Sequence, residues 1–478
     1  MAELSFPLIS AAVAIPVLAA LAAFQREARA RVAGMVGTLG ASLCAAEIVR
    51  EVSIAGGTRL EEPWRLGFFA ADSLNAIFLL VYSLLTMGIV ILAPRRDTGA
   101  KITGTTLLVL AATMAAYGAD NLAILSAAWV LTALPFIAGP FTGSWRSRAG
   151  LAASCAAMLC AIGIIASAAS ASGDLEPYSL VKPQGHHYGG PAAFALLIVA
   201  IVFRKGIFPA HAWMEDAVES GPVLLAGLFI NGHLGAFLLA RVVIPAFPLS
   251  ARGAFPILAN LALFTAIYAA VRALAERKAR RILALLVLSQ SACILAGLES
   301  ATQEGITGAL VHCMVVSAAT KGLFSVLRLL EVRFGRSFTA DQYLGLQEYT
   351  PRLAVFFAVC GLALVGLPGT LGFCSEELLI HGTMASYPQV GFLLPVATAM
   401  NAVSLFRLFS KIFLGTHRTG VQGVGDALPR ERWVLSAIVA AIVGFGLAPG
   451  VLIDLRANAA QEIGQRLANV TATITSRQ

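Results

Sequence analysis

Lys205 lies inside a long apolar segment, in the stretch FRKGIFPAHAWMEDA (203–217), and Pro209 follows it by one turn. A charged side chain near the bilayer centre costs about 2.5 to 3.5 kcal/mol on insertion scales, so an ionisable residue there is a functional candidate. Proline breaks a helix, and a lysine beside a break can serve a proton relay. The alternative is a lysine that reaches the membrane interface with its long side chain, which is also what we expect of Arg204.

Lys321 is a second candidate, because apolar and small residues surround it in VHCMVVSAATKGLFSVL. His312 stands nine positions earlier, about two and a half turns, so the two side chains face opposite sides of one helix. His312 is either a hydrogen-bonded core residue or a weaker relay candidate. His233, in FINGHLGAFLLAR, is a further polar residue within an apolar segment and is also a weaker candidate.

A third site lies in GLALVGLPGTLGFCSEELLIHG, where Pro368 and nearby glycines interrupt an apolar segment before Glu376 and Glu377. A broken helix within a membrane is tolerated where it is buried in protein or lines a cavity. An ionisable group after such a break suits proton transfer. The alternative is that these acids face an interface.

These residues require helices that hold them within the membrane. Of the 478 residues, 58% are hydrophobic and 13% are charged, whereas soluble domains carry about 25% charged residues. Segments able to cross roughly 30 Å of hydrocarbon recur to the end of the chain and predict one all-α, polytopic membrane domain (1–478) with about fourteen spans. We place these spans near 5–24, 32–50, 68–93, 103–119, 121–141, 149–171, 191–214, 222–245, 254–275, 281–298, 304–331, 353–380, 389–415 and 432–453.

Lys and Arg gather in the loops after odd-numbered spans, which predicts that those loops are cytoplasmic and that both termini lie outside a bacterial inner membrane. The exception is the acidic stretch MEDAVES, expected as a loop after span seven. The net charge of +8 fits loops that face an anionic leaflet and does not suggest nucleic acid. The first apolar run is expected to be a spanning helix, not a cleaved signal, and the segment from Arg456 onward is expected to be a short polar tail with no further span.

The sequence suggests neither a metal nor a cofactor. Its seven cysteines are scattered, without a CxxC pair or a Cys/His metal spacing, and we expect them to be apolar filler without disulfides. Nucleotide, flavin, haem and iron–sulfur motifs are likewise missing from the sequence. A driving force would therefore come from a partner.

The two helix breaks, at Pro209 and Pro368, fall five spans apart. Interrupted spans at matching places in two halves indicate an internal repeat with a relay site in each half. We expect repeat one at about 103–245 and repeat two at about 254–415.

These motifs resemble those of the antiporter-like subunits of respiratory complex I, a family shared with Mrp cation/proton antiporters, membrane-bound hydrogenases and DAB-type inorganic-carbon transporters. The resemblance covers nearly the whole chain and implies fourteen core helices with two inverted five-helix repeats and broken helices seven and twelve. KGIFPAHAWMEDA is similar to the family's K-x-x-x-P-x-H-x-W-x-x-x-A. It implies that Lys205 is a relay lysine and that Pro209, His211 and Trp213 shape its helix break.

Three further motifs extend the resemblance. RRILALLVLSQ is similar to K-R-x-L-A-x-S-x-x-S-Q and puts Arg280 in a relay-lysine position, while ATKGLF implies the same role for Lys321. GLPGTLGFCSEELL is similar to G-I-P-P-x-x-G-F-x-S-K-D-x-I-L and implies that Glu376 is the exit residue after the Pro368 break.

The chain also departs from the family pattern. Val130 follows Trp129 where the family carries a glutamate that partners the helix-seven lysine. Ser317 and Cys313 occupy the places of two helix-eleven histidines, and Leu228 that of a helix-eight histidine. Without the carboxylate, Lys205 must find another partner to stay charged.

Three functions follow as expectations. The first is a proton-translocating subunit of a multi-subunit membrane complex of the NADH:quinone oxidoreductase or hydrogenase type, with Lys205, Arg280, Lys321 and Glu376 on a mid-membrane axis. The second is a non-pumping coupling or scaffold subunit, including the membrane subunit of a DAB-type system. The third is an Mrp-type Na⁺/H⁺ antiporter subunit. Each implies the lipid bilayer and other membrane subunits as partners, with a soluble or redox module beside them.

Overall fold

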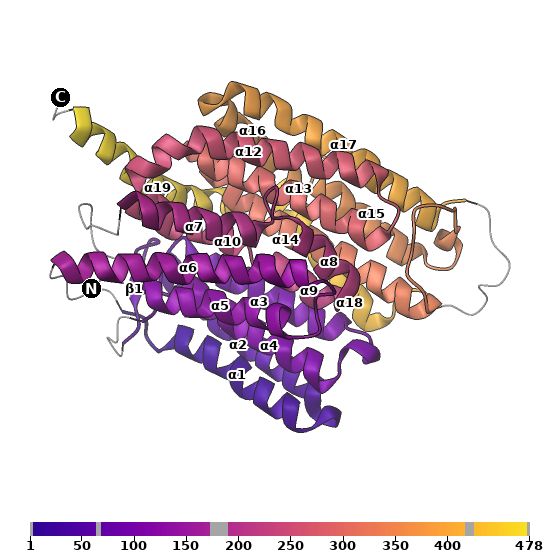
Figure 1. Ribbon diagram of the computed structural model, residues 1–478. Helices are drawn as coiled ribbons and strands as arrows, with labels where there is room; N and C mark the ends of the chain where they lie inside the picture. Colours follow the sequence, from indigo (N-terminus) through magenta and orange to yellow (C-terminus); the bar gives the residue numbers. More distant parts are fainter. Residues whose placement is uncertain (1–2, 64–67, 173–189, 416–424, 476–478) are drawn as a thin grey trace.

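The structure, a computed structural model, describes residues 3–63, 68–172, 190–415 and 425–475. Apolar segments in a membrane must satisfy their backbone hydrogen bonds internally, which favours helices. The described chain is accordingly all-α apart from one short strand pair, and most of its long helices run along a common direction (Figure 1). The predicted fold class is confirmed.

The helices of the first half are α1 Leu8–Gln25, α2 Ala30–Ile54, α3 Asn75–Leu92, α4 Ala100–Gly118, α5 Leu122–Ala138, α6 Trp145–Ser172, α7 Gly190–Lys205, α8 Ala212–Ser220, α9 Val223–Ile230, α10 Leu234–Leu238 and α11 Ile244–Ala246. Those of the second half are α12 Pro248–Ala275, α13 Ala279–Glu299, α14 Gln303–Phe334, α15 Pro351–Leu364, α16 Leu371–Ser386, α17 Pro388–Phe413, α18 Pro429–Leu447 and α19 Gly450–Thr475. The short elements are η1 Glu27–Arg29, η2 Arg95–Asp97, the π-helical η3 Leu239–Val243, η4 Leu346–Glu348, and the antiparallel strands β1 Leu60–Glu61 and β2 Ala70–Ala71.

Every expected span coincides with one of these helices or with a broken group of them. Within the described ranges, ten helices are long and apolar enough to cross a membrane, or up to eleven if the bent pair α18 and α19 is one span. Helices α5 and α15 are apolar but shorter. The chain is thus a multi-pass membrane protein, and the number of fourteen crossings stays a prediction.

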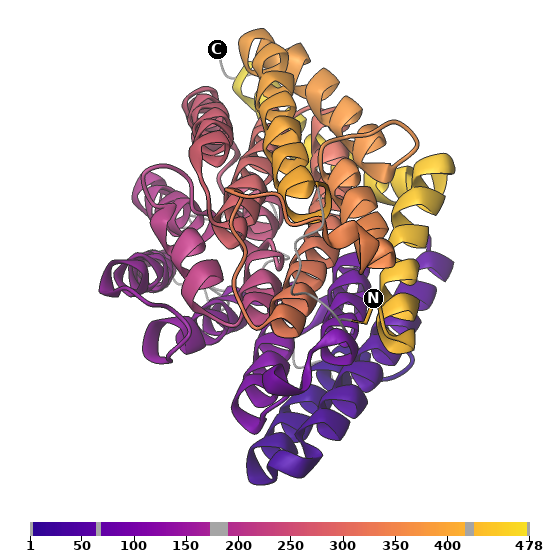
Figure 2. The same cartoon turned by 90° about the vertical axis from the view of Figure 1, so that its right-hand side faces the viewer.

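Helices α13 and α14 form the centre of the bundle, together with the group α9 to α11. They pack against each other, and α12, α16 and α17 cover them on one side. In Figure 2 the N-terminal helices (indigo) and the helices of residues 350–415 (orange) lie at opposite ends of the view, with the yellow C-terminal helices along one side. Large apolar side chains such as Phe392 and Ile257 face outward from the outer helices. The polar residues of α13 and α14 are therefore shielded from lipid.

The two ends of the bundle are defined by residues that lie there. The Asp120 end holds the α4–α5 junction, where Asp120 pairs with Arg59 and Arg241 pairs with Asp72. Burial raises the pKa of the Asp120 carboxyl to about 6, against the lowering by the Arg59 and Arg241 guanidinium groups. The Arg280 end holds the start of α13. The charge bias of the loops predicts that the Arg280 end is cytoplasmic.

The polar tail expected from Arg456 onward is helical and forms most of α19. Helix α19 meets α18 at an angle of 78°. Arg456 of α19 is fully buried, donates hydrogen bonds to the carbonyl oxygens of Leu74 (2.9 Å) and Ser73 (3.0 Å), and lies over the Phe78 ring. The expectation failed because buried residues recur on one face of α19 within a mostly polar sequence, which is the pattern of a packed amphipathic helix.

Candidate functional site

Helix α7 ends at Lys205, four residues before Pro209, where the sequence predicts the break. Gly206 has a positive φ of 67°, a conformation that glycine adopts readily at the end of a helix. Pro209 then keeps the chain from continuing as a helix until α8 begins at Ala212. The released carbonyl of Phe203 accepts a hydrogen bond from Trp213 Nε1 at 2.7 Å. The break thus leaves Lys205 at the inner end of a half-length helix.

The Lys205 side chain is buried, which excludes a position at the interface. Its Nζ lies 2.6 Å from Ser291 Oγ of α13 and 3.0 Å from Nδ1 of His233. Among the described residues, no carboxylate forms an ion pair with Lys205. The polar partners of Lys205 are therefore a histidine and a hydroxyl.

His233 stands at a helix break that was not predicted from the sequence. The residues between α9 and α10 are Asn231, Gly232 and His233, and His233 has a φ of 43°, in the left-handed region. Released carbonyls find partners on neighbouring helices, since Tyr117 Oη donates to Gly232 O and Tyr82 Oη to Leu228 O (3.3 Å). The Asn-Gly pair is a turn signal that could have revealed this break.

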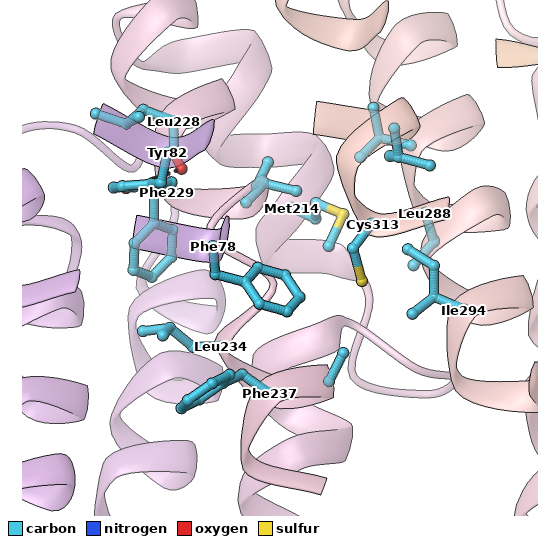
Figure 3. Close-up of a cluster of buried hydrophobic side chains, with 14 of the residues drawn as sticks. Phe78, Tyr82, Met214, Leu228, Phe229, Leu234, Phe237, Leu288, Ile294 and Cys313 are labelled. Carbon is cyan, nitrogen blue, oxygen red and sulfur yellow. Dashed lines mark hydrogen bonds between the residues drawn. The ribbon is translucent and has the colours of Figure 1, made fainter. Parts of the chain in front are cut away.

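Aromatic and aliphatic side chains enclose this break. Figure 3 shows Phe229 and Phe237 on its two sides, with Phe78 and Tyr82 of α3 beside them and Cys313 of α14 facing the cluster. All of these side chains are buried. The polar groups at the break therefore lie in an apolar shell.

His312 connects α14 to two other helices. Its Nε2 lies 2.8 Å from Gln290 Oε1 of α13, and its Nδ1 lies 3.0 Å from Ser375 Oγ of α16. His312 is completely surrounded by protein and bonded through both ring nitrogens. The ring bridges α13 and α16. His312 is therefore a hydrogen-bonded core residue, and this position is also compatible with a role in a proton relay.

Glu376 follows Ser375 in α16, directly after the break that separates α15 from α16 around Pro368. Thr398 Oγ1 of α17 donates a hydrogen bond to Glu376 Oε1. Gly366, with a φ of 70°, leaves room that a Cβ would take from the other carboxylate oxygen. Glu377 differs, because it is exposed and lies 3.8 Å from His381. The alternative that these acids face an interface thus fits Glu377, whereas Glu376 faces inward.

Together these contacts form a row of polar side chains, which we call the polar row: His233, Lys205, Ser291, Gln290, His312, Ser375, Glu376 and Thr398. Its members come from α7, the α9–α10 break, α13, α14, α16 and α17. Direct contacts link them except at two places, where successive residues of one helix diverge by about 100°. A transfer there needs a water molecule or a side-chain rotation. Asn401 Nδ2 of α17, which donates to Ser289 Oγ at 2.8 Å, adds a second contact across the same region.

Lys321 lies away from this row, nine residues and about 13 Å along α14 from His312. It is almost completely buried, and its Nζ has no hydrogen-bond partner in the part of the chain that the structure describes. One turn before it, Ser317 Oγ donates to Asn231 O at 3.0 Å; one turn after it stands Ser325. Lys321 is thus deeply placed, as predicted, between the α9–α10 break and the Arg280 end.

The expected position of Arg280 on a mid-membrane axis is wrong. Arg280 is the second residue of α13, eleven positions before Ser291, so it lies about 16 Å along the helix from the Lys205 contact. Its Nε and Nη2 donate to Glu331 at 2.7 and 2.6 Å, a bidentate pair. Its Nη1 donates to backbone carbonyls at the end of α8, including Glu219 O at 3.1 Å. This arrangement clamps three helix ends together.

The expected interfacial position of Arg204 is also wrong. The Arg204 guanidinium carbon lies 4.0 Å from the Phe229 ring centroid and 5.0 Å from that of Trp129, and Arg204 donates to Thr132 Oγ1. Trp129 and Thr132 flank Val130 on α5. The cation that faces this part of α5 is therefore Arg204, while Lys205 points to α10 and α13. Attraction to aromatic faces compensates part of the cost of burying the guanidinium.

The acidic stretch MEDAVES forms helix α8 where a loop was expected. Glu215 is buried and pairs with Arg272 at 2.6 Å, and Asp216 accepts a hydrogen bond from Ser144 N at 2.8 Å. His211, at the start of α8, places Nε2 3.1 Å from Tyr268 Oη. These two acids make contacts between helices, which is why the prediction of a loop was wrong. Within the described ranges, no group of three or more His, Cys, Asp or Glu residues is arranged to hold a metal.

Comparison with known proteins places this geometry in a family. The family described as "NADH:quinone oxidoreductase/Mrp antiporter, TM" matches residues 147–401. NADH-quinone oxidoreductase subunit M of Mycobacterium tuberculosis is 28% identical over 277 residues, which are 57% of this chain and 50% of that protein. The chain spans about half the length of the curated relatives it matches.

Solved structures match over almost the entire chain. A chain of respiratory complex I from Thermus thermophilus with bound NADH superimposes with a TM-score of 0.83 and 25% identity, covering 96% of this chain and 99% of that chain. A chain of the Mrp complex from Dietzia sp. DQ12-45-1b gives a TM-score of 0.79 at 18% identity, with 96% and 99% covered. The first likeness agrees with the family match, and the second supports the fold.

Proposed function

The chain belongs to the NADH:quinone oxidoreductase/Mrp antiporter membrane-subunit family, and from this premise we propose that it is a proton-translocating subunit of a larger membrane complex. Protons would pass along the polar row between Lys205 and Glu376. The observation that carries this proposal is the continuity of contacts from Lys205 through Ser291 and from Gln290 through His312 to Ser375. The members of the row on α13, α14 and the α9–α10 break lie in the shielded centre of the bundle, and the row reaches Glu376 and Thr398 on the covering helices α16 and α17.

The chemistry of the row suits proton transfer. Lysine, histidine and glutamate each exist in a protonated and a deprotonated form that side-chain contacts can favour in turn. Ser291, Gln290 and Ser375 hold hydrogen-bonding groups between them. One proton leaves a nitrogen or oxygen as the next group accepts it, so no redox cofactor of this chain is required.

Lys321 supplies access from the Arg280 end in this proposal. On α14, Ser325 and Arg328 follow Lys321 at helical spacing, and Arg328 pairs with Asp97 at 2.6 Å. Ser325 Oγ and Lys321 Nζ are both buried without a partner among the described residues. Two unsatisfied polar groups one turn apart favour water between them. A proton reaching Lys321 would pass on towards Asn231 and His233.

The breaks after Lys205 and before Glu376 also support the proposed repeats, 103–245 and 254–415, each with a relay group beside a helix break. We place the chain in a bacterial inner membrane with its Arg280 end facing the cytoplasm. Its partners would be other membrane subunits and a soluble or redox module of the NADH:quinone oxidoreductase or hydrogenase type. These partners would supply the driving force.

A non-pumping coupling or scaffold subunit is the second candidate function, and it includes the membrane subunit of a DAB-type system. The observation in its favour is that Lys205 has no carboxylate partner among the described residues, while Val130 stands in the family's glutamate position. An Mrp-type Na⁺/H⁺ antiporter subunit gains no specific observation from the described residues.

The test uses membrane vesicles that hold the intact complex and a potassium diffusion potential as a driving force that needs no electron donor. Lys205→Met and Glu376→Gln are each expected to lower the rate of ΔpH formation at least about tenfold, because each removes a proton-carrying group. Glu377→Gln is the matched control and is expected to leave the rate unchanged. Unchanged rates in both Lys205→Met and Glu376→Gln would contradict proton transfer along the polar row and would leave the scaffold function.

A further inference from the structure

Glu299 is a buried carboxylate outside the polar row. It is the last residue of α13, at the Asp120 end, and only 5% of it is exposed. Its Oε2 has no hydrogen-bond partner among the described residues, and no cation among them forms an ion pair with it. A negative charge at a helix C-terminus also meets the unfavourable end of the helix dipole. Stability therefore gives no reason for an acid at this position.

Glu299 faces the same way as the residue that contacts Lys205. Ser291, Leu295 and Glu299 are spaced by four along α13, which puts them on one helix face. Ser291 Oγ lies 2.6 Å from Lys205 Nζ. Glu299 is two turns further out, about 12 Å along the helix. The same face of α13 thus presents a hydroxyl to Lys205 and a carboxylate near the bundle end.

A small cavity of about 10 Å³, room for about one water molecule, lies along this face. Leu295 and Glu299 of α13 line it together with Ile198 and Ile201 of α7, which stand about two turns and one turn before Lys205, and with Leu239 of η3. Among its described lining residues, Glu299 is the one with an ionisable side chain. We call the apolar part formed by Ile198, Ile201 and Leu295 the gasket.

We propose that Glu299 is an outward proton acceptor for Lys205, separated from it by the gasket. The inference rests on the proposed function, because Lys205 must deliver the proton. When a chain of water molecules fills the gasket, an N–H bond of the Lys205 ammonium breaks, each water accepts one proton and passes one on, and an O–H bond forms on the Glu299 carboxylate. While the gasket is dry, no proton passes from Lys205 to Glu299, since an apolar cavity of this kind stays empty unless polar groups bind its water. This proton path from Lys205 to Glu299 ends at the Asp120 end of the bundle.

The test opens the gasket in the full-length chain reconstituted into liposomes and measures proton uptake under a potassium diffusion potential. Leu295→Asn introduces a water-binding group, and we expect it to raise the proton conductance about tenfold over the unmodified chain. The double variant Leu295→Asn/Glu299→Gln is expected to return to the unmodified level, and so is Leu295→Asn/Lys205→Met. Glu304→Gln, an exposed acid in the first turn of α14, is the control that leaves the Leu295→Asn conductance unchanged.

Ile198→Ser opens the gasket from α7 and guards against a folding defect of one variant, with size-exclusion profiles confirming the folded state of each. Conductance that persists with Glu299→Gln would overturn the role of Glu299, and so would openers that conduct no more than the unmodified chain. Both results are independent of the Glu376→Gln result in the intact complex. The two tests therefore distinguish a failure of proton transfer from Lys205 to Glu299 from a failure of proton transfer along the polar row.

Discussion

Lys205 Nζ lies 3.0 Å from His233 Nδ1, and this contact joins two helix breaks that are far apart along the chain. Lys205 ends α7, and His233, which itself has the left-handed conformation, directly precedes α10. Both breaks expose side chains and carbonyls that a continuous helix would keep occupied. Lys205 is therefore held by a histidine that the α9–α10 break brings to it.

Replacing His233 by leucine is expected to lower ΔpH formation about tenfold in vesicles that hold the intact complex, because Lys205 keeps Ser291 but loses a group that accepts its proton. The rate of quenching of a ΔpH-sensitive dye under a potassium diffusion potential measures this. His381→Gln is the control, since His381 is largely exposed near the end of α16. Equal rates in both variants would remove His233 from the relay.

Gly235→Ala tests the position of the Lys205 side chain without changing any polar group. A Cβ at residue 235 would lie 2.5 Å from Lys205 Cγ, so the lysine must move away from Ser291. We expect transport to fall towards the level of Lys205→Met. Gly253→Ala in α12 meets nothing within 4 Å and is the matched control, with unchanged transport. Normal transport in Gly235→Ala would contradict the observed placement of Lys205.

Arg280→Gln is expected to affect stability instead of the relay. It leaves the buried Glu331 with Arg328 alone and releases the carbonyls at the end of α8, at a cost of about 3 kcal/mol. The midpoint of thermal unfolding in detergent should fall, while the transport rate per assembled complex stays the same. A variant of normal thermal stability with slow transport would restore Arg280 to the proton path.

Arg204→Leu removes a buried cation and leaves no polar group without a partner, because Thr132 Oγ1 also donates to Trp129 O at 2.8 Å. Replacing a buried charge by a packed apolar side chain is often neutral or stabilising. We therefore expect an equal or higher thermal midpoint and retained transport, in contrast to Lys205→Met. Loss of transport in a stable Arg204→Leu variant would show that the relay needs this charge.

Much of this architecture could be predicted from local sequence. Pro209 and Pro368, with their neighbouring glycines, marked two breaks, and the apolar run around Lys321 indicated its burial. Arg204 could not be placed this way, because the rings that hold it come from α5 and α9. Arg280 was misplaced because its role was taken from the family motif, although the predicted span 281–298 put it at a helix start; its partner Glu331 lies 51 residues away. Contacts between helices, unlike helix breaks, leave no short-range pattern in the sequence.

His312 is the central link of the polar row, because its two ring nitrogens contact Gln290 and Ser375. The decisive measurement is the rate of ΔpH formation in vesicles with His312→Leu, Glu376→Gln and the double variant. If the two residues act in series on one path, each single variant loses about tenfold or more, and the double variant is no slower than the slower single. Unchanged transport in His312→Leu, or losses that multiply in the double variant, would contradict a single row of proton transfer.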